Sequence, residues 1–157
     1  MKTKKFLLTA AVLAGAGMLV GADPKGFEIW SGSDLRDYGK KLGPKMSEKK
    51  VATEQLARYD KHNVMMAYRE GDGEAEVHDN MVDVFVVQSG EATVVVGGKV
   101  VGERTIGPGE IRADSIEGGT KHPLKAGDVV NIPAKVPHQV LVSSGKKVTY
   151  LIVKVAQ

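Results

Sequence analysis

The sequence predicts an all-β domain, a small antiparallel barrel or sandwich with α-helices on its N-terminal side. From residue 62 onward, runs of β-branched and apolar residues such as VDVFVVQ and VTYLIVKV are separated by short glycine-containing turns. This pattern is typical of antiparallel strands joined as hairpins. Before residue 62 the apolar residues follow a helical spacing instead. We therefore expect a helical extension over residues 23–61 and a β-barrel domain over residues 62–157.

The first 22 residues are predicted to be a secretory signal peptide. A basic start (MKTKK) precedes an apolar stretch over residues 6–20, and small residues follow up to Ala22. A retained membrane anchor is the alternative, but a span needs about 20 apolar residues and glycines interrupt this stretch. We expect cleavage after Ala22 and a periplasmic or secreted protein that has no membrane contact once the signal is removed.

Charge and composition exclude several kinds of function. Lys2, Lys4 and Lys5 belong to the leader, so the 22 basic residues of the chain fall to 19, which equals the 19 acidic residues. A net charge near zero gives no reason to expect a nucleic-acid partner. The chain has no cysteine, which excludes disulfides and thiolate ligands. Any metal ion must therefore be bound by histidine, carboxylate, amide or water.

Three elements are predicted in the N-terminal extension. The segment FEIW, within Asp23–Ser31, has the composition of a short β-segment. Ser33 is a candidate N-cap for a helix over DLRDYGKKL, which has acidic residues early, lysines late and an end at Gly43-Pro44. A second helix is predicted over SEKKVATEQLARYD, with Ser47 as its cap. We expect both helices to pack on the outside of the barrel or across a dimer.

A cluster of polar residues stands where a short polar segment meets a strongly apolar one. His78 and Asn80 are two positions apart, so in a strand their side chains point to the same face. Asp83 begins the next strand, in phase with Phe85, and His138 opens another apolar strand about sixty residues later. We expect these strand ends to converge, so that the four polar side chains surround one site for a metal ion.

The stretch that leads to His138 resembles one of the paired motifs of the cupin superfamily, which reads G-x5-P-x-G-x2-H-x3-N. Gly127, Pro133 and His138 match it. Lys135 stands at the inner glycine of the motif, and Val142 stands at its terminal asparagine.

The chain matches the first cupin motif less fully. In that motif H-x-H is followed by a glutamate, and E-x6-G is its end. His78 takes the first histidine, Asn80 the second, Asp83 the glutamate and Gly90 the final glycine. The spacing between Asn80 and Asp83 is one residue shorter than the motif allows. The resemblance covers residues 64–155 and implies a double-stranded β-helix, the jelly-roll barrel of this superfamily.

Cupins generally bind a divalent ion through three histidines and a glutamate. The resemblance therefore implies metal ligation by His78, Asp83 and His138, with Asn80 as the fourth ligand. Two imidazoles and one carboxylate suit iron in oxygenases, and they also suit zinc, manganese or nickel. The altered ligands Asn80 and Asp83 leave open the alternative that no metal is bound, as in cupins that serve only as a scaffold.

The function stays open between an enzyme and a binding protein. In the enzyme hypothesis the ion activates dioxygen or polarises a small organic acid or sugar. The alternative is a non-catalytic cupin that holds a small ligand or serves oligomerisation, and in either case we expect a homodimer. The side chains expected to contact a small-molecule ligand, or to support the metal ligands, are Arg69, Tyr68, Phe85, Arg112 and Gln139.

Other polar residues are placed less closely by the sequence. Arg69 and Glu76 lead towards the cluster, and they either line the mouth of the barrel or pair with each other on the surface. The glycine-rich, charged stretch Glu103–Lys121 interrupts the strand pattern and is either a functional loop or a solvated one. His62 is too distant in sequence to place, and His122 is expected on the surface.

Overall fold

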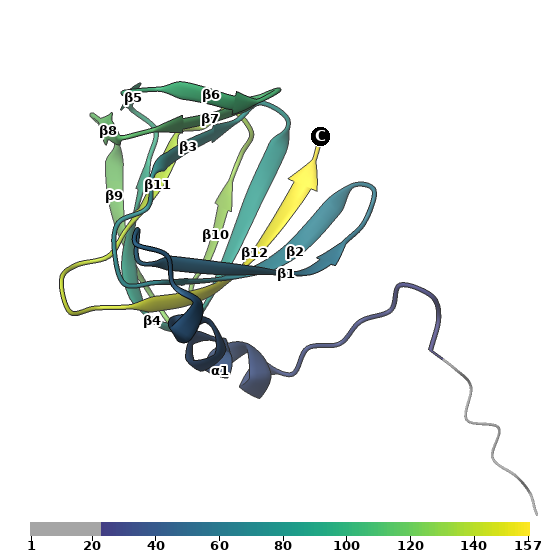
Figure 1. The fold of residues 1–157 in the computed structure, drawn as a ribbon. Coiled ribbons are helices and arrows are strands. Elements are labelled where there is room, and N and C mark those ends of the chain that lie inside the picture. The colour runs from purple at the N-terminus through teal and green to yellow at the C-terminus, as the bar shows by residue number, and fades with distance from the viewer. Residues whose placement is uncertain (1–22) are drawn as a thin grey trace, which may run out of the picture.

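A computed structural model describes residues 23–157, and the predicted signal peptide lies outside the described residues. Figure 1 shows strands curled around a common interior, with the single helix of this part of the chain outside them. No helix among residues 23–157 is long and apolar enough to cross a membrane. The elements are, in order, α1 (Gly32–Leu42), the 3-10 turn η1 (Gly43–Lys45), β1 (Val51–Arg58), β2 (His62–Arg69), β3 (Ala75–His78), β4 (Met81–Val96), β5 (Lys99–Val101), β6 (Arg104–Gly107), β7 (Glu110–Ala113), β8 (Ser115–Glu117), β9 (Thr120–Lys125), β10 (Val129–Ile132), β11 (His138–Leu141) and β12 (Val148–Ala156).

All strand pairs are antiparallel, and the strands form two facing sheets that share β4. The first half of β4 pairs with β12 and β10, and β12 continues to β2 and β1. The second half pairs with β9 and β11, and β11 continues to β3, β7 and β6. The strands β5 and β8 form a separate small pair. The predicted all-β jelly-roll barrel is confirmed.

The shared strand β4 turns from one sheet into the other at Gly90. The sequence predicted a turn here, but the strand continues through it. Gly90 has a φ of 77°, a conformation that glycine adopts without steric cost. A Cβ atom at this position would overlap the backbone carbonyl oxygen of Lys147. Glycine is therefore required at the corner that brings the two halves of the barrel together.

The interior of the barrel is filled by the alternate, inward-facing residues of its strands. Burial of these apolar side chains removes them from water and is the main stabilising contribution to such a core. The buried residues of this cluster are Ala67, Phe85, Val87, Val94, Leu124, Ile132, Val140, Val142, Val148, Tyr150 and Ile152.

The predicted first helix is present as α1, with a shifted start. Its N-cap is Ser31, whose side chain accepts a hydrogen bond from the backbone N–H of Asp34, whereas Ser33 had been predicted. The helix ends before Gly43, as expected. The segment FEIW forms no strand, so that prediction is wrong.

The prediction of a second helix is wrong, because residues 51–58 form the edge strand β1. In this strand Ala52, Glu54 and Leu56 alternate towards α1, and the Glu54 carboxylate accepts hydrogen bonds from Tyr38 (2.9 Å) and Lys41 (2.5 Å). Pairing with β2 supplies backbone hydrogen bonds that a local helical pattern does not reveal. The helix α1 thus packs on the outer face of β1 and β2, as Figure 1 shows.

The stretch Glu103–Lys121 is not an unstructured loop. It contains the hairpin of β6 and β7, and β7 pairs with β3. This pairing sets Glu110 opposite His78 and Arg112 opposite Glu76. The stretch therefore contributes two charged residues next to the predicted metal ligands.

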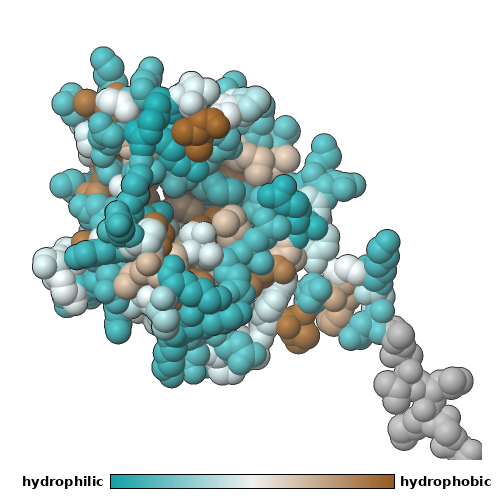
Figure 2. All heavy atoms as spheres, viewed as in Figure 1, coloured by the Kyte–Doolittle hydropathy of each residue, from teal (hydrophilic) through white to brown (hydrophobic). Residues whose placement is uncertain are grey.

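The outer surface is mostly polar. Figure 2 shows hydrophilic residues over most of one face, with apolar residues in small separate groups. The exposed large apolar side chains are Phe27, Ile29, Val101, Ile106, Val129 and Val155.

Candidate metal centre

Two carboxylate and two imidazole side chains converge inside the barrel. Strand β3 contributes Glu76 and His78, β4 contributes Asp83, and β11 contributes His138. Asp83 and His138 stand two positions from core residues of their own strands. Residues two apart in a strand point to the same face, so both side chains point inward. One ligand atom from each of the four residues lies within 4.8 Å of the others. The sequence motifs far apart in the chain therefore meet at one place.

The structure brings His78, Asp83 and His138 together, but it does not bring in Asn80. Strand β3 ends at His78, so the expected shared strand face of His78 and Asn80 is not formed. Asn80 is an exposed residue of the following bend, and its carbonyl accepts a hydrogen bond from Gln157 N. Glu76 takes the fourth place instead. The same two-residue alternation, applied backwards from His78, would have indicated Glu76.

The turn that leads into β11 ties the two halves of the site together. Lys135 has a φ of 67°, an uncommon conformation for a residue other than glycine. Its backbone N–H donates a hydrogen bond of 2.7 Å to the carbonyl of His78. Lys135 stands where the cupin motif has its inner glycine. Glycine adopts a positive φ without steric cost, which explains why the motif prefers glycine at this position.

Both imidazole rings are oriented by hydrogen bonds at Nδ1. His138 Nδ1 lies 3.1 Å from the carbonyl oxygen of Val136, and His78 Nδ1 lies 2.7 Å from a carboxylate oxygen of Glu110. A carbonyl oxygen can only accept, so the Nδ1 of His138 carries the proton. Such partners are typical of metal-binding histidines, and they leave each Nε2 facing the other ligands.

The two Nε2 atoms face carboxylates. His78 Nε2 lies 3.2 Å from Glu76 and 3.4 Å from Asp83, and His138 Nε2 lies 3.5 Å from Asp83. His138 Nε2 is buried and has no hydrogen-bond partner among residues 23–157. Buried polar atoms are nearly always paired, so an unpaired nitrogen that faces a carboxylate points to a ligand.

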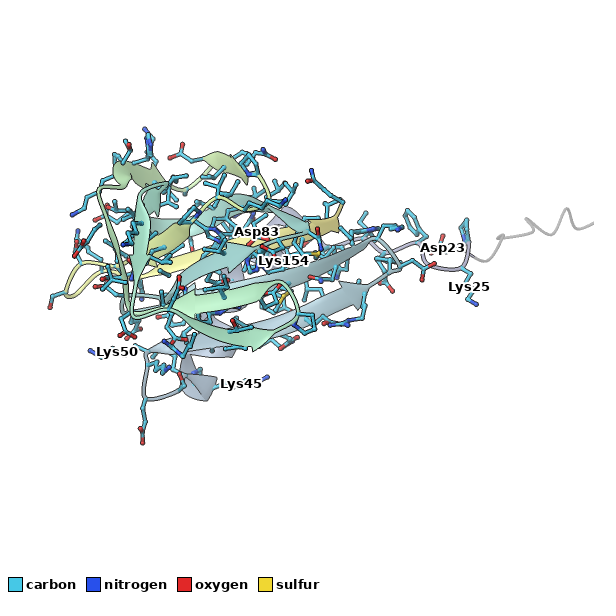
Figure 3. All side chains as sticks on the ribbon, turned by 90° about the horizontal axis from the view of Figure 1, so that it is seen from above. Asp23, Lys25, Lys45, Lys50, Asp83 and Lys154 are labelled. Carbon is cyan, nitrogen blue, oxygen red and sulfur yellow. The ribbon has the colours of Figure 1, made fainter. Side chains whose placement is uncertain are left out.

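Lys154 is a further member of the site that the sequence reasoning missed. Its ammonium group donates hydrogen bonds to both carboxylate oxygens of Asp83, at 2.8 and 2.7 Å, and its nitrogen lies 2.9 Å from His78 Nε2. Figure 3 shows Asp83 and Lys154 next to each other inside the molecule. Along β12 it follows Val148, Tyr150 and Ile152 at every second position. It is the one charged residue on this inward face, a signal that the sequence does contain.

The charges in the site stabilise one another. Burial raises the pKa of Asp83, but the nearby imidazoles of His138 and His78 and the charge of Lys154 hold it well below its usual range. Burial likewise opposes ionisation of Glu76, but the contact with His78 and the charge of Arg112 lower its pKa to about 2. Both carboxylates are therefore ionised at neutral pH.

The carboxylates around His78 favour its protonated form. Burial lowers the pKa of His78, but the hydrogen bonds with Asp83 and Glu76 outweigh this effect and raise the pKa to about 9. The positive charge of Lys154, whose nitrogen lies 2.9 Å from His78 Nε2, acts in the opposite direction and lowers this pKa.

A pocket of about 210 Å³ is lined by three of the four residues of this cluster, Glu76, Asp83 and His138. Away from this cluster, the barrel interior is filled by Phe85, Val87 and Val140, which belong to the packed core. The open space is therefore confined to the end of the barrel that carries the charged residues. Four of the residues predicted to contact a ligand line this pocket, namely Arg69, Phe85, Arg112 and Gln139.

Tyr68 does not line the pocket. It packs against the helix α1 on the outer face of the sheet, and its hydroxyl donates to Glu70. Burial and that contact raise the pKa of Tyr68 to about 12. Gln139 does not support an imidazole either, because its amide donates to the carbonyl of Gly73 at 2.8 Å. The expected roles of Tyr68 and Gln139 as partners of the ligating histidines are not found.

Arg69 and Glu76 do not pair with each other. Arg69 Nε donates to the Tyr150 hydroxyl at 2.8 Å, and Glu76 pairs with Arg112 at 3.3 Å. His122 is exposed on β9, as predicted.

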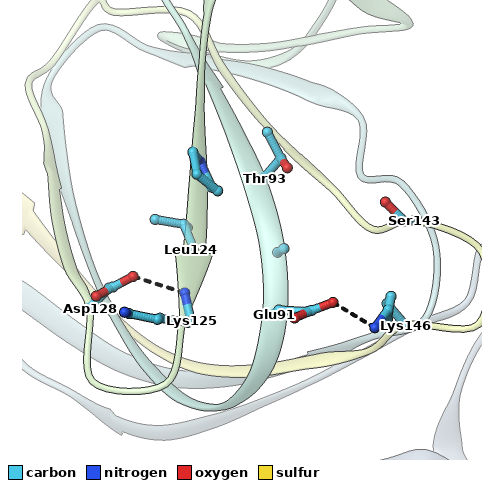
Figure 4. Close-up of a pocket in the computed structure, with 9 residues that line it drawn as sticks. Glu91, Thr93, Leu124, Lys125, Asp128, Ser143 and Lys146 are labelled. Carbon is cyan, nitrogen blue, oxygen red and sulfur yellow. Dashed lines mark hydrogen bonds and ion pairs between the residues drawn. The ribbon is translucent and has the colours of Figure 1, made fainter.

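A separate surface groove of about 550 Å³ lies beside the corner of β4, and none of the four candidate metal ligands lines it. Figure 4 shows one ion pair and one hydrogen bond from a backbone N–H to a carboxylate among the residues that line it. Glu91 pairs with Lys146 at 2.9 Å, and the Asp128 carboxylate accepts a hydrogen bond from the backbone N–H of Lys125 at 2.8 Å. These satisfied surface groups give no indication of a ligand.

Comparisons with known proteins establish the fold. No protein-family model matches the chain, and no curated protein sequence matches it. A double-stranded β-helix protein from Klebsiella pneumoniae aligns with a TM-score of 0.57 and 18% identity, over 83% of this chain and 90% of that chain. The cupin domain of Cnp3 from Schizosaccharomyces pombe aligns with a TM-score of 0.53 and 9% identity, over 73% and 71% of the two chains. The chain has the cupin fold.

The chain is also similar in structure to the DMSP lyase DddQ from Ruegeria pomeroyi. It aligns with a TM-score of 0.50 and 16% identity, over 69% of this chain. The present chain spans only about half of that lyase, 48% of its length. The expected resemblance to the cupin superfamily is thus confirmed at the level of the fold.

The residues of this site fit a divalent ion. Two imidazole nitrogens and two carboxylates are donors that zinc, iron, manganese and nickel accept. The donor side chains of His78, Asp83 and His138 are buried, and both imidazoles carry supporting hydrogen bonds at Nδ1. Lys154 opposes an ion, because its positive charge already contacts two of the four donors, and Arg112 pairs with a third, Glu76.

Proposed function

We propose that this cupin binds one divalent metal ion through Glu76, His78, Asp83 and His138 and holds a small organic molecule in the adjoining pocket. The observation that carries the proposal is the buried, unpaired Nε2 of His138, which faces Asp83 at 3.5 Å. A bound ion would supply a Lewis acid beside the pocket. The donor set suits iron, manganese, zinc or nickel.

The pocket favours a small organic acid. Arg69 and Arg112 both line it, and guanidinium groups bind carboxylates through paired hydrogen bonds. Arg112 already contacts Glu76 and Glu110, at 3.3 and 3.5 Å. Among residues 23–157 no carboxylate lies within 4.0 Å of Arg69, whose terminal nitrogens make no hydrogen bond there. Arg69 is therefore the residue best placed to bind a ligand carboxylate.

Metal content tests the proposal. Protein treated with a chelator and then dialysed against Mn²⁺, Fe²⁺, Zn²⁺ or Ni²⁺ is expected to retain about one ion per chain and to unfold at a higher temperature. His138→Ala removes an Nε2 donor and should lower the bound ion at least about tenfold, since ligands act together in one site.

The matched control for that experiment is His122→Ala, which removes an exposed histidine from β9 and should leave metal content unchanged. Equal metal content in the His138→Ala protein and the wild type would contradict this assignment of the site.

A second candidate function is metal-independent binding of a small ligand by a non-catalytic cupin. Lys154 favours it, because its ammonium group supplies a cation to Asp83 within the site. Small carboxylic acids that bind equally well with and without a chelator would support this candidate over the first.

We further propose that the mature protein is exported and forms a homodimer. The support for export is the basic and apolar leader over residues 1–22, whose small residues precede Ala22. Cell fractionation should find a protein that lacks these residues in the periplasm or the medium. Light scattering of that protein should give twice the mass of one chain, and a monomer would contradict the dimer.

A further inference from the structure

We infer that Lys154 is a built-in competitor for the metal ion, so that the site exists in either an ammonium-bound or a metal-bound form. This inference rests on the proposed binding of a metal by the same residues. It adds a regulatory role for a residue that lies outside both sequence motifs.

The competition follows from the atoms that Lys154 contacts. Its nitrogen lies 2.8 and 2.7 Å from the two oxygens of Asp83 and 2.9 Å from His78 Nε2. These are donor atoms that a metal ion needs from the same residues. An ion bound to Asp83 and His78 would meet an ammonium group at close range, where two positive charges repel strongly in a buried site. The ammonium and the ion therefore exclude each other.

The fold keeps Lys154 in this position. Lys154 on β12 is the direct partner of Asp83 on β4 in the strand register, so their side chains start from neighbouring backbone positions. Charged hydrogen bonds of this length are among the stronger ones in proteins. An ion must break all three of them, which lowers its apparent affinity for the site.

The lysine also has a route out of the site. Lys154 is near the C-terminal end of β12, and its side chain keeps 17% of its surface exposed although Asp83 keeps only 2%. A four-carbon side chain can extend along an apolar wall and still place its charge in water. Displacement by an ion therefore needs a rotation of the side chain and no change in the strands.

Titration with Mn²⁺ alone, followed by calorimetry, tests the competition. The variant Lys154→Met removes the ammonium group and keeps an unbranched side chain of similar length, so it should bind Mn²⁺ at least about tenfold more tightly than the wild type. Lys154→Gln keeps a neutral donor and should show the same direction if the methionine variant does not fold.

The matched control is Lys121→Met, which removes an exposed lysine from β9 and should leave the affinity for Mn²⁺ unchanged. Equal affinities in the wild type and both Lys154 variants would overturn the competition and leave the proposed function intact. Binding by the Lys154 variants alone would support the competition and contradict the proposed function of the natural chain. No binding by any of these proteins would overturn both.

A second measurement uses the unaltered protein. Acetylation of lysine amines, followed by mass spectrometry, should label Lys154 at least about threefold faster with saturating Mn²⁺ than with chelator, because a displaced amine becomes accessible. The labelling of Lys121 should not change. A Lys154 labelling rate that Mn²⁺ does not alter, in protein shown to bind the ion, would contradict the displacement.

Discussion

Asp83→Asn is expected to destabilise the protein by about 3–5 kcal/mol, because removal of one member of a buried ion pair leaves the other member uncompensated. The Asp83 side chain is only 2% exposed, and both of its oxygens accept hydrogen bonds from Lys154. Asparagine has nearly the same shape but carries no charge, so the change isolates the electrostatic contribution. Urea unfolding in the presence of a chelator measures the free energy of unfolding without a contribution from bound metal.

A double-mutant cycle shows whether the loss arises from the pair. Asp83→Asn with Lys154→Met removes both charges, so the two single losses should not add, with a coupling of at least about 1 kcal/mol. Glu91→Gln is the surface control, since it breaks an exposed pair with Lys146 and should leave the unfolding midpoint unchanged. Additive losses at Asp83 and Lys154 would show that the two charges do not stabilise each other.

The destabilisation should also depend on pH in a defined direction. The pKa of Asp83 is held well below its usual range in the folded protein, so its ionised form stabilises the fold above the unfolded pKa of about 3.9. That contribution is lost as the pH falls below this value. The difference in stability between wild type and Asp83→Asn should therefore be constant between about pH 5 and pH 6 and smaller at about pH 3.5. Urea unfolding at the two pH values tests this.

The barrel could be predicted because its signals are local. Alternating residues and glycine turns mark β4, β11 and β12, and the motif residues Asp83 and His138 lie in β4 and β11. The error at β1 has a physical reason, since residues 51–58 have a helical spacing of apolar residues but obtain their backbone hydrogen bonds from β2. Edge strands of this kind depend on a partner that no single stretch of sequence contains.

The site could be predicted only in part, for a similar reason. His78, Asp83 and His138 stand in recognisable motifs, and the structure brings them together. Glu76 has no place in the motif, although strand alternation puts it next to His78. Lys154 lies 71 residues from Asp83, and their contact depends on the pairing of β12 with β4. The charge that we propose competes with a metal ion is therefore placed by long-range strand order.

The second large effect is expected at the corner of β4. Gly90→Ala should cost at least about 3 kcal/mol, because two penalties combine at this position. The φ of 77° is unfavourable for any residue with a Cβ atom, and that atom would overlap the carbonyl oxygen of Lys147. The backbone on both sides is held in strand pairs, so the overlap cannot be relieved by a small local shift. Urea unfolding followed by circular dichroism measures the loss.

Gly97→Ala separates the two penalties at Gly90. Gly97 has a similar φ of 74°, but no atom lies within 4 Å of the place where its Cβ would stand. Only the backbone conformation is then unfavourable, and the expected cost is about 1–2 kcal/mol. A much larger loss at Gly90 than at Gly97 means that the close approach of β4 to Lys147 requires glycine there. Equal losses would mean that the corner can open to accept a side chain, and that the two sheets meeting at β4 are less rigidly joined than their register indicates.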